Sequence, residues 1–273
     1  MLRVIHNYGM VQRAASSKKG AKVSIPPQDP HSTDPGFARG LFSAALRLLL
    51  PQDCMLCGAA IGPAEDDQPI CTACAARLPR LQAGHCPVCA LPTAQGETCG
   101  ACQRKPPNFD ATLAPLVYAF PVDRLAQALK YHHRLALADW MGLQLADELT
   151  RHGEQPDLIV PMPLHPRRLA ERGFNQALEL ARPLSRLSGI PLDWTAVERK
   201  LDAPPQASLP WKARKKNVRG VFLCLKDLTG LHVLVVDDVM TTGATLDELA
   251  RSLKTRGAAR VTNIVVARTL PHS

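Results

Sequence analysis

From residue 111 onward, short apolar runs alternate with segments whose apolar residues recur every three or four positions. Strands are predicted for the runs "TLAPLVYAF" (despite Pro115), "DLIVPMP", "HVLVVDD" and "RVTNIVVART". Helices are predicted for "DRLAQALKYHH", "ALADWMGLQLADELTRHG", "FNQALELARPLSRLSG" and "TLDELARSLKTRGA". The second helix should end at Gly153, and Pro183 should kink or break the third. This alternation favours an α/β fold with a mostly parallel sheet and helices on both faces.

Composition divides the chain into three expected regions. Residues 1–40 are polar and basic, so we expect a disordered tail. Residues 41–105 start with a short amphipathic helix over 41–50 and continue into a small cysteine-rich module. The segment "KPPNFD" marks the boundary to the α/β domain over residues 111–273. No apolar run is long enough to cross a bilayer and no compact signal peptide is visible, so we expect a cytoplasmic location.

Eight of the nine cysteines form four Cys-x-x-Cys pairs. Two residues between ligands let one tight turn present both sulfurs to one metal ion, and four thiolates complete a closed, structural zinc site. Disulfides fit less well without a secretory signal, and an iron–sulfur cluster is the weaker metal alternative. Sequential pairing would give two sites along the chain, while crossed pairing stays open. The predicted ligands of the two zinc ions are Cys54, Cys57, Cys71, Cys74, Cys86, Cys89, Cys99 and Cys102.

The formal net charge of +9 is concentrated in two segments. Residues 1–52 carry seven positive and two negative side chains, which a solvated tail explains. Residues 199–220 carry seven positive and one negative, which favours an anionic partner, either a diphosphate or a nucleic-acid backbone. Within that segment, Trp211 can stack on a base or anchor the loop to the core. Residues 53–110 carry six negative and four positive side chains, which argues against DNA binding by the cysteine-rich module.

The stretch "VLVVDDVMTTGATLDEL" (233–249) joins a strand that ends in two aspartates to a small-residue loop and a helix start. Open α/β sheets bind ligands at this carboxyl end of a strand. The loop offers three hydroxyls, closely spaced N–H groups, a glycine that permits close approach, and the positive end of a helix dipole. These groups suit a phosphate, and carboxylates accept hydrogen bonds from vicinal diols, so a ribose 5-phosphate fits both. The alternative is an ordinary strand–turn–helix with a Thr N-cap.

This stretch, from Val233 to Thr245, resembles the phosphoribosyl-pyrophosphate loop of type I phosphoribosyltransferases. Together with the paired cysteines, "PMPLHPRRLAERGFNQA" (161–177) and "KNVRGVF" (216–222), it resembles the ComF/GntX family over about residues 42–270. The resemblance implies a double zinc ribbon before a type I phosphoribosyltransferase-like domain. It also implies phosphoribosyl pyrophosphate with Mg²⁺ as ligand and, in some members, an association with competence and DNA uptake.

The resemblance also assigns roles to residues. Asp237 and Asp238 are the candidate catalytic residues, and their carboxylates would bind the ribose 2- and 3-hydroxyls. The residues expected to hold the 5-phosphate are Thr241, Thr242, Gly243, Ala244 and Thr245. Guanidinium groups suit the diphosphate, and the candidates are Arg167, Arg168, Arg172 and Arg219.

Five further residues have two interpretations each. Asn175 and Gln176 either face the site or cap a helix. Lys130, with His132 and His133, either reaches the acceptor or lies on the surface at a helix end.

The sequence supports three functional hypotheses. The first is a Mg²⁺-dependent phosphoribosyltransferase whose acceptor is a purine base, an orotate-like ring, ammonia or a nucleic-acid end. The second is a non-catalytic accessory factor that handles single-stranded DNA and works with DNA-uptake or recombination proteins. The third is a regulator that binds the phosphorylated sugar without turnover.

Overall fold

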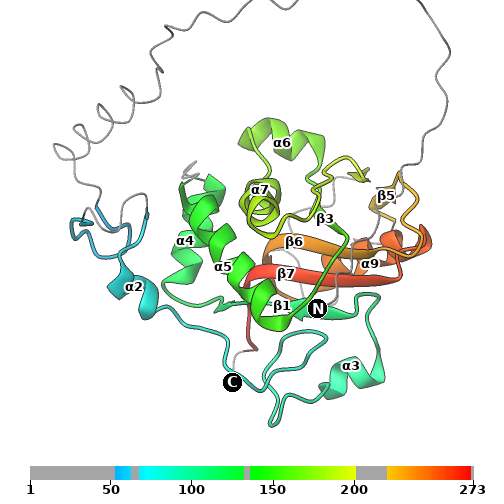
Figure 1. Cartoon of the computed structure of the whole chain (residues 1–273), viewed down its shortest axis with the longest axis horizontal. Coiled ribbons are helices and arrows are strands. Elements are labelled where there is room, and N and C mark those ends of the chain that lie inside the picture. The colour runs from blue at the N-terminus through cyan, green and yellow to red at the C-terminus, as the bar shows by residue number, and fades with distance from the viewer. Residues whose placement is uncertain (1–52, 63–67, 132–135, 201–219, 272–273) are drawn as a thin grey trace, which may run out of the picture. The chain divides into compact units, whose positions relative to one another are not determined.

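The computed structural model describes residues 53–62, 68–131, 136–200 and 220–271 (Figure 1). The expected basic tail, the helix over 41–50, His132, His133 and the segment from Trp211 to Arg219 lie outside these ranges. Within the described ranges, no helix is long and apolar enough to cross a membrane.

The central sheet is parallel, as predicted. Its strands lie in the order β1 (Ala111–Leu113), β7 (Arg260–Arg268), β6 (His232–Met240) and β3 (Leu158–Pro161). A further short strand, β2 (Leu116–Val117), also pairs with β7, and every pairing in this sheet is parallel. A separate antiparallel pair joins β4 (Val197–Arg199) to β5 (Phe222–Cys224). The carboxyl ends of the parallel strands therefore meet at one edge of the sheet.

Helices cover both faces of the sheet, because its central strands are apolar on both sides. Val233 and Val235 of β6 pack in the same core as Leu249 of α9 (Ala244–Thr255). Leu234 and Val236, which alternate with them, pack with α4 (Val122–Tyr131), α5 (Ala136–His152) and α7 (Gln176–Ser188). Figure 1 shows α5 and α7 on one side of β6 and β7 and α9 on the other. The four helices predicted from periodicity are thus confirmed.

Three details of the strands and helices differ from the simplest reading of the sequence. The first predicted strand is divided into β1 and β2 on either side of Pro115, because proline has no N–H to donate to a ladder. Strand β6 does not end at the two aspartates but stays paired with β7 as far as Met240. Helix α7 is not broken at Pro183, which packs on Gly142 of α5: a β-carbon there would lie 2.3 Å from Pro183 Cγ.

The cysteine-rich module contains two copies of one local arrangement. In each copy, the first Cys-x-x-Cys pair lies on a tight turn closed by a residue with positive φ, Gly58 in the first and Ala90 in the second. Each second pair begins at the N-cap of a short helix, Cys71 before α2 (Thr72–Ala76) and Cys99 before α3 (Gly100–Arg104). This repeat brings each turn and the following helix to one cluster of sulfurs.

Candidate functional site

The eight paired cysteines form two clusters of four, in sequential order along the chain. One cluster contains Cys54, Cys57, Cys71 and Cys74, and the other contains Cys86, Cys89, Cys99 and Cys102. Within each, the sulfurs all lie within 4.8 Å of one another, and neighbouring pairs are 3.9 Å (Cys57–Cys71) and 3.6 Å (Cys89–Cys99) apart. A zinc–sulfur bond of about 2.3 Å places tetrahedral ligands roughly 3.8 Å apart, so the clusters fit two zinc ions. The crossed pairing is thereby excluded.

Backbone N–H groups favour the thiolate form of at least one of these sulfurs, that of Cys54. Burial raises the pKa of Cys54, but the N–H groups of Cys71, Cys57 and Leu56 outweigh this effect and lower it to about 6. The N–H of Cys71 donates to Cys54 Sγ over 3.3 Å. Hydrogen bonds of this kind stabilise the thiolate, which is the form that binds zinc.

We expect protein purified under reducing conditions to contain about two zinc ions per chain and to release both to a strong chelator. Because four thiolates surround each ion and the module has few large apolar residues, chelation should unfold residues 53–104 before the sheet. Metal analysis with hydrogen exchange checks this. A zinc-free protein with the module intact would contradict it.

The two aspartates of β6 lie side by side in a partly enclosed position. Asp237 Oδ1 accepts a hydrogen bond from the N–H of Asp238 over 2.9 Å. The Asp238 side chain is 7% exposed and forms an ion pair with the ammonium of Lys130, from the last turn of α4. Burial, and after it the charge of Asp238, raises the pKa of Asp237 to about 8. The pair therefore holds about one negative charge more easily than two.

The sequence left two positions open for Lys130, one near the acceptor site and one on the surface. Burial alone would lower its pKa, but the charge and hydrogen bond of Asp238 outweigh burial and raise it. The apolar stripe of α4 includes Val122 and Ala126, and Lys130 follows at the same four-residue spacing. A lysine that continues the buried, apolar stripe of a helix indicates that an oppositely charged group lies nearby in the interior.

The loop between β6 and α9 turns sharply at Gly243, which has φ +77° and is the N-cap of α9. The left-handed backbone favours glycine, and a β-carbon there would lie 2.6 Å from Cε at the end of the flexible Met240 side chain, which would have to move. The Thr242 hydroxyl accepts a hydrogen bond from the N–H of Ala244 over 3.2 Å. The N-cap is therefore not a threonine, although Thr242 does bond a loop N–H.

Replacing Gly243 by alanine should lower the free energy of unfolding by at least about 1–2 kcal/mol, the cost of left-handed backbone for a residue with a β-carbon. Gly230→Ala is the matched control, because Gly230 has φ +80° and open space where a β-carbon would lie. Denaturant titration of both variants separates the backbone cost from the contact with Met240. Equal stability losses would show that the Met240 side chain simply moves aside.

Three of the arginines proposed for the diphosphate lie on a short helix, α6 (Pro166–Arg172), just after β3. Because β3 pairs with β6 in parallel, α6 begins at the same edge of the sheet as the aspartates. Arg172 Nη1 donates to Gln176 Oε1 over 3.2 Å. Arg167 and Arg168 are on the same helix, and Arg219 lies outside the described residues.

Asn175 is a helix cap, which decides between its two interpretations. Its side-chain oxygen accepts from the N–H of Ala177 over 3.0 Å, and its amide donates to the Met162 carbonyl over 3.1 Å. Asn175 thus fixes the start of α7 to the chain that leaves β3.

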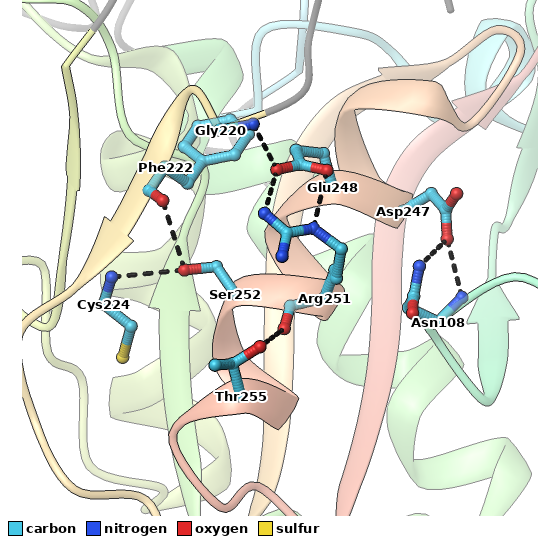
Figure 2. A network of polar contacts seen from close by, with 9 residues as sticks. All are labelled: Asn108, Gly220, Phe222, Cys224, Asp247, Glu248, Arg251, Ser252 and Thr255. Atoms are coloured by element: carbon cyan, nitrogen blue, oxygen red, sulfur yellow. Dashed lines mark hydrogen bonds and ion pairs between the residues drawn. The ribbon is translucent and has the colours of Figure 1, made fainter.

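Figure 2 shows how the first turns of α9 anchor two other segments. Asp247 Oδ1 accepts from both the backbone N–H (2.6 Å) and the side-chain amide (2.8 Å) of Asn108, in the linker after the second cysteine cluster. Glu248 Oε1 accepts from the N–H of Gly220 over 2.7 Å, and Arg251 holds the same carboxylate. Gly220, the last residue of the basic segment and described in the structure, is therefore held against the first turns of α9.

The fold and the two cysteine clusters define a class: a double zinc ribbon joined to a phosphoribosyltransferase-like α/β domain. A family description for a double zinc ribbon domain matches residues 45–103, and one for a phosphoribosyl transferase domain matches residues 144–270. The chain belongs to the ComF family, in agreement with the resemblance seen in its motifs.

Relatives with known names support this assignment, and one solved structure also aligns with part of the chain. The DNA utilization protein YhgH of Salmonella typhimurium is 35% identical over 229 residues, which cover 82% of this chain and 100% of the relative. The competence protein ComFC of Bacillus subtilis is 29% identical over 217 residues, covering 74% and 85%. The solved purine phosphoribosyltransferase of Pyrococcus horikoshii Ot3 aligns with 57% of this chain and 88% of its own at 21% identity, with a TM-score of 0.30.

Proposed function

We propose that this protein binds phosphoribosyl pyrophosphate together with Mg²⁺ and transfers the phosphoribosyl group to an acceptor. The observation that carries the proposal is the enclosed carboxylate pair of Asp237 and Asp238 near the carboxyl end of β6, a few residues before the left-handed Gly243 and the N-terminus of α9. A purely structural strand end has no need of two adjacent carboxylates in an enclosed position, where their charges oppose each other.

Each part of the ligand has a matching group along the carboxyl edge of the sheet. The carboxylates of Asp237 and Asp238 accept hydrogen bonds from the ribose 2- and 3-hydroxyls. The loop from Thr241 to Thr245, with the positive end of the α9 dipole, binds the 5-phosphate. The guanidinium groups of α6 contact the diphosphate. The ligand would thus extend from α9 across β6 toward β3, the order in which the sheet presents these groups.

The proposed reaction breaks the bond between C1 of the ribose and the diphosphate oxygen while an acceptor lone pair forms a bond to C1 from the opposite face. Positive charge develops at C1, and negative charge develops on the departing diphosphate. The chain orients the ribose through its carboxylates and stabilises the leaving group through its arginines, so catalysis is positioning and electrostatics. Carboxylate oxygens are ligands that suit Mg²⁺, and this ion supplies further positive charge to the diphosphate when it is bound.

Binding of this ligand requires a rearrangement at Asp238. In the structure the Lys130 ammonium occupies the position beside this carboxylate. Ribose hydroxyls or a cation at Asp238 would replace that contact. Lys130 thus neutralises the carboxylate pair until the ligand arrives.

Isothermal titration with phosphoribosyl pyrophosphate and Mg²⁺ tests the proposal. We expect the wild type to bind and Asp237→Asn/Asp238→Asn to lose binding by at least about a hundredfold, since two charge-assisted contacts disappear. Asp139→Asn is the control, because Asp139 of α5 forms an exposed ion pair with Arg186 of α7. A zinc-loaded, folded wild type that does not bind would sink the proposal, and so would equal binding by both variants.

A second candidate function is single-stranded DNA handling without catalysis. It is favoured by the names of the relatives, a DNA utilization protein and a competence protein. The basic segment of residues 199–220 is the proposed contact with the phosphate backbone.

If residues 199–220 contact DNA, Lys215→Ala and Arg219→Ala should each reduce the slope of log affinity against log salt by about 0.7, the value for one phosphate contact to a single strand. Fluorescence anisotropy with a labelled oligonucleotide measures the slope. Lys226→Ala, outside the basic segment, should leave it unchanged. Slopes that match the wild type in all three variants would exclude this contact.

A further inference from the structure

The last residue of β7, Arg268, lies in the core with an exposed fraction of 3%. Its Nε donates to the carbonyl of Cys89, a member of the second cysteine cluster, over 2.7 Å. Its Nη1 donates to the carbonyls of Met240 (2.9 Å) and Thr241. Met240 is the last residue of β6, and Thr241 is the first residue of the loop from Thr241 to Thr245. One buried guanidinium therefore joins the second cysteine cluster to the loop proposed to hold the 5-phosphate.

The buried positive charge of this guanidinium also indicates an electrostatic interaction with the second cysteine cluster. Among the described residues, no carboxylate lies within ion-pair distance of Arg268, and its hydrogen-bond acceptors there are carbonyl oxygens. A zinc ion with four thiolates carries a net charge of about −2. A buried charge requires an opposite charge nearby, and the second cluster supplies it. The favourable position of Arg268 thus depends on the charged, metal-bound form of that cluster.

The arrangement fixes which way the loop peptides face. In a planar trans peptide the C=O and the N–H point in opposite directions. Because Arg268 holds the carbonyls of Met240 and Thr241, the N–H groups of Thr241 and Thr242 point away from Arg268. Loss of the guanidinium would free the peptide between Thr241 and Thr242, whereas the Met240 carbonyl would keep its hydrogen bond from the N–H of Thr269 (3.0 Å). An anion site built from backbone N–H groups requires that they stay fixed.

The two cysteine clusters differ in this respect. Cys86, Cys89 and Cys102 pack in the same core as Met240 and Leu246, whereas Cys54 packs in the core on the other face of the sheet, with α4, α5 and α7. The structure also contains a cavity of about 250 Å³ lined jointly by Cys89, Cys102 and residues 240–244. Only the second cluster therefore borders the loop.

We propose that the second metal site acts on ligand binding through Arg268, as a positioning residue, while the first metal site does not. Zinc at Cys86, Cys89, Cys99 and Cys102 holds Arg268, and Arg268 holds the loop in the form that binds an anion. The part of this inference that concerns phosphoribosyl pyrophosphate rests on the proposed function. The part that concerns loop order does not.

Hydrogen exchange of peptides spanning residues 237–249 tests loop order without any ligand. Two variants each remove one sulfur ligand: Cys99→Ser from the second site and Cys57→Ser from the first. Zinc analysis should find about one ion in each. We expect exchange in this span to be at least about tenfold faster in Cys99→Ser, the factor implied by loss of one hydrogen bond to a charged donor, and unchanged in Cys57→Ser. Exchange of β6 residues 233–236 should be unchanged in both.

Arg268→Met tests the positioning residue itself, with both zinc ions retained. We expect the same faster exchange in residues 237–249. Should this variant not fold, the comparison of Cys99→Ser with Cys57→Ser still decides the matter. Equal exchange in those two variants, or wild-type exchange in a folded Arg268→Met, overturns the inference.

Titration with phosphoribosyl pyrophosphate and Mg²⁺ then separates this inference from the proposed function. Cys99→Ser should bind at least about fivefold more weakly than Cys57→Ser, because its loop must first be ordered. If the wild type does not bind but exchange differs between the variants, the proposed function fails and the coupling stands. If the wild type binds, and both variants bind and exchange alike, the function stands and the coupling fails.

Discussion

Replacing Lys130 by methionine should lower the free energy of unfolding by about 3 kcal/mol near pH 7. Removal of one partner from a buried ion pair costs about 3–5 kcal/mol, because the other charge stays buried without compensation. The side chains of Lys130 and Asp238 are 23% and 7% exposed, so the lower end of that range applies. Methionine preserves most of the length and apolar surface of the lysine stem. The loss should therefore reflect charge and not packing.

The matched control is Lys254→Met, since Lys254 and Asp110 are 2.8 Å apart and both 33% exposed. A pair of that exposure contributes up to about 1 kcal/mol. Chemical denaturation measures the free energy of unfolding of both variants. The double variant Lys130→Met/Asp238→Asn should recover much of the stability that Lys130→Met loses. Adding Mg²⁺ should stabilise Lys130→Met more than the wild type, because the ion no longer competes with an ammonium. Equal losses for the two lysine variants would show that solvent already screens Asp238.

The features that the sequence predicted depend on neighbours along the chain. Parallel strands buried on both faces form continuous apolar runs, so β3, β6 and β7 were recognisable from their composition alone. The same holds for the cysteine pairs, whose two-residue spacing is itself the geometry of a metal turn. The position of Asp237 and Asp238 at the carboxyl edge follows from the strand they belong to. In each case a few adjacent residues are sufficient.

The features that it did not predict depend on contacts between distant segments. Lys130 lies in a helical stripe, but its partner Asp238 is determined by how α4 packs on the sheet. Arg268 ends an apolar strand, and nothing near it in the sequence indicates the carbonyl of Cys89. Pro183 was expected to disturb its helix. The sequence does not show its close contact with Gly142, because that residue belongs to another helix. Arrangements of this kind require the packed structure.

The affinity for phosphoribosyl pyrophosphate should rise about tenfold between pH 7 and pH 9. A carboxylate must be ionised to accept hydrogen bonds from both ribose hydroxyls, and burial beside Asp238 raises the pKa of Asp237 to about 8. The ionised fraction then increases from about one tenth at pH 7 to about nine tenths at pH 9. The phosphate monoester, with its second pKa near 6, is already ionised throughout this range. Titrations at saturating Mg²⁺ measure the effect.

The stability of the free protein should change in the opposite direction over the same range. The folded-state pKa of Asp237 lies above its unfolded value, so its contribution to stability is complete below about pH 4 and is lost as the pH rises through 8. The melting temperature of the free protein should therefore fall from pH 7 to pH 9 while ligand affinity increases. Asp237→Asn should bind weakly, with no pH dependence, and should not show this fall. A wild-type affinity that is constant over this range would mean that Asp237 is already ionised at pH 7, with the charge of Lys130 offsetting its burial and the charge of Asp238.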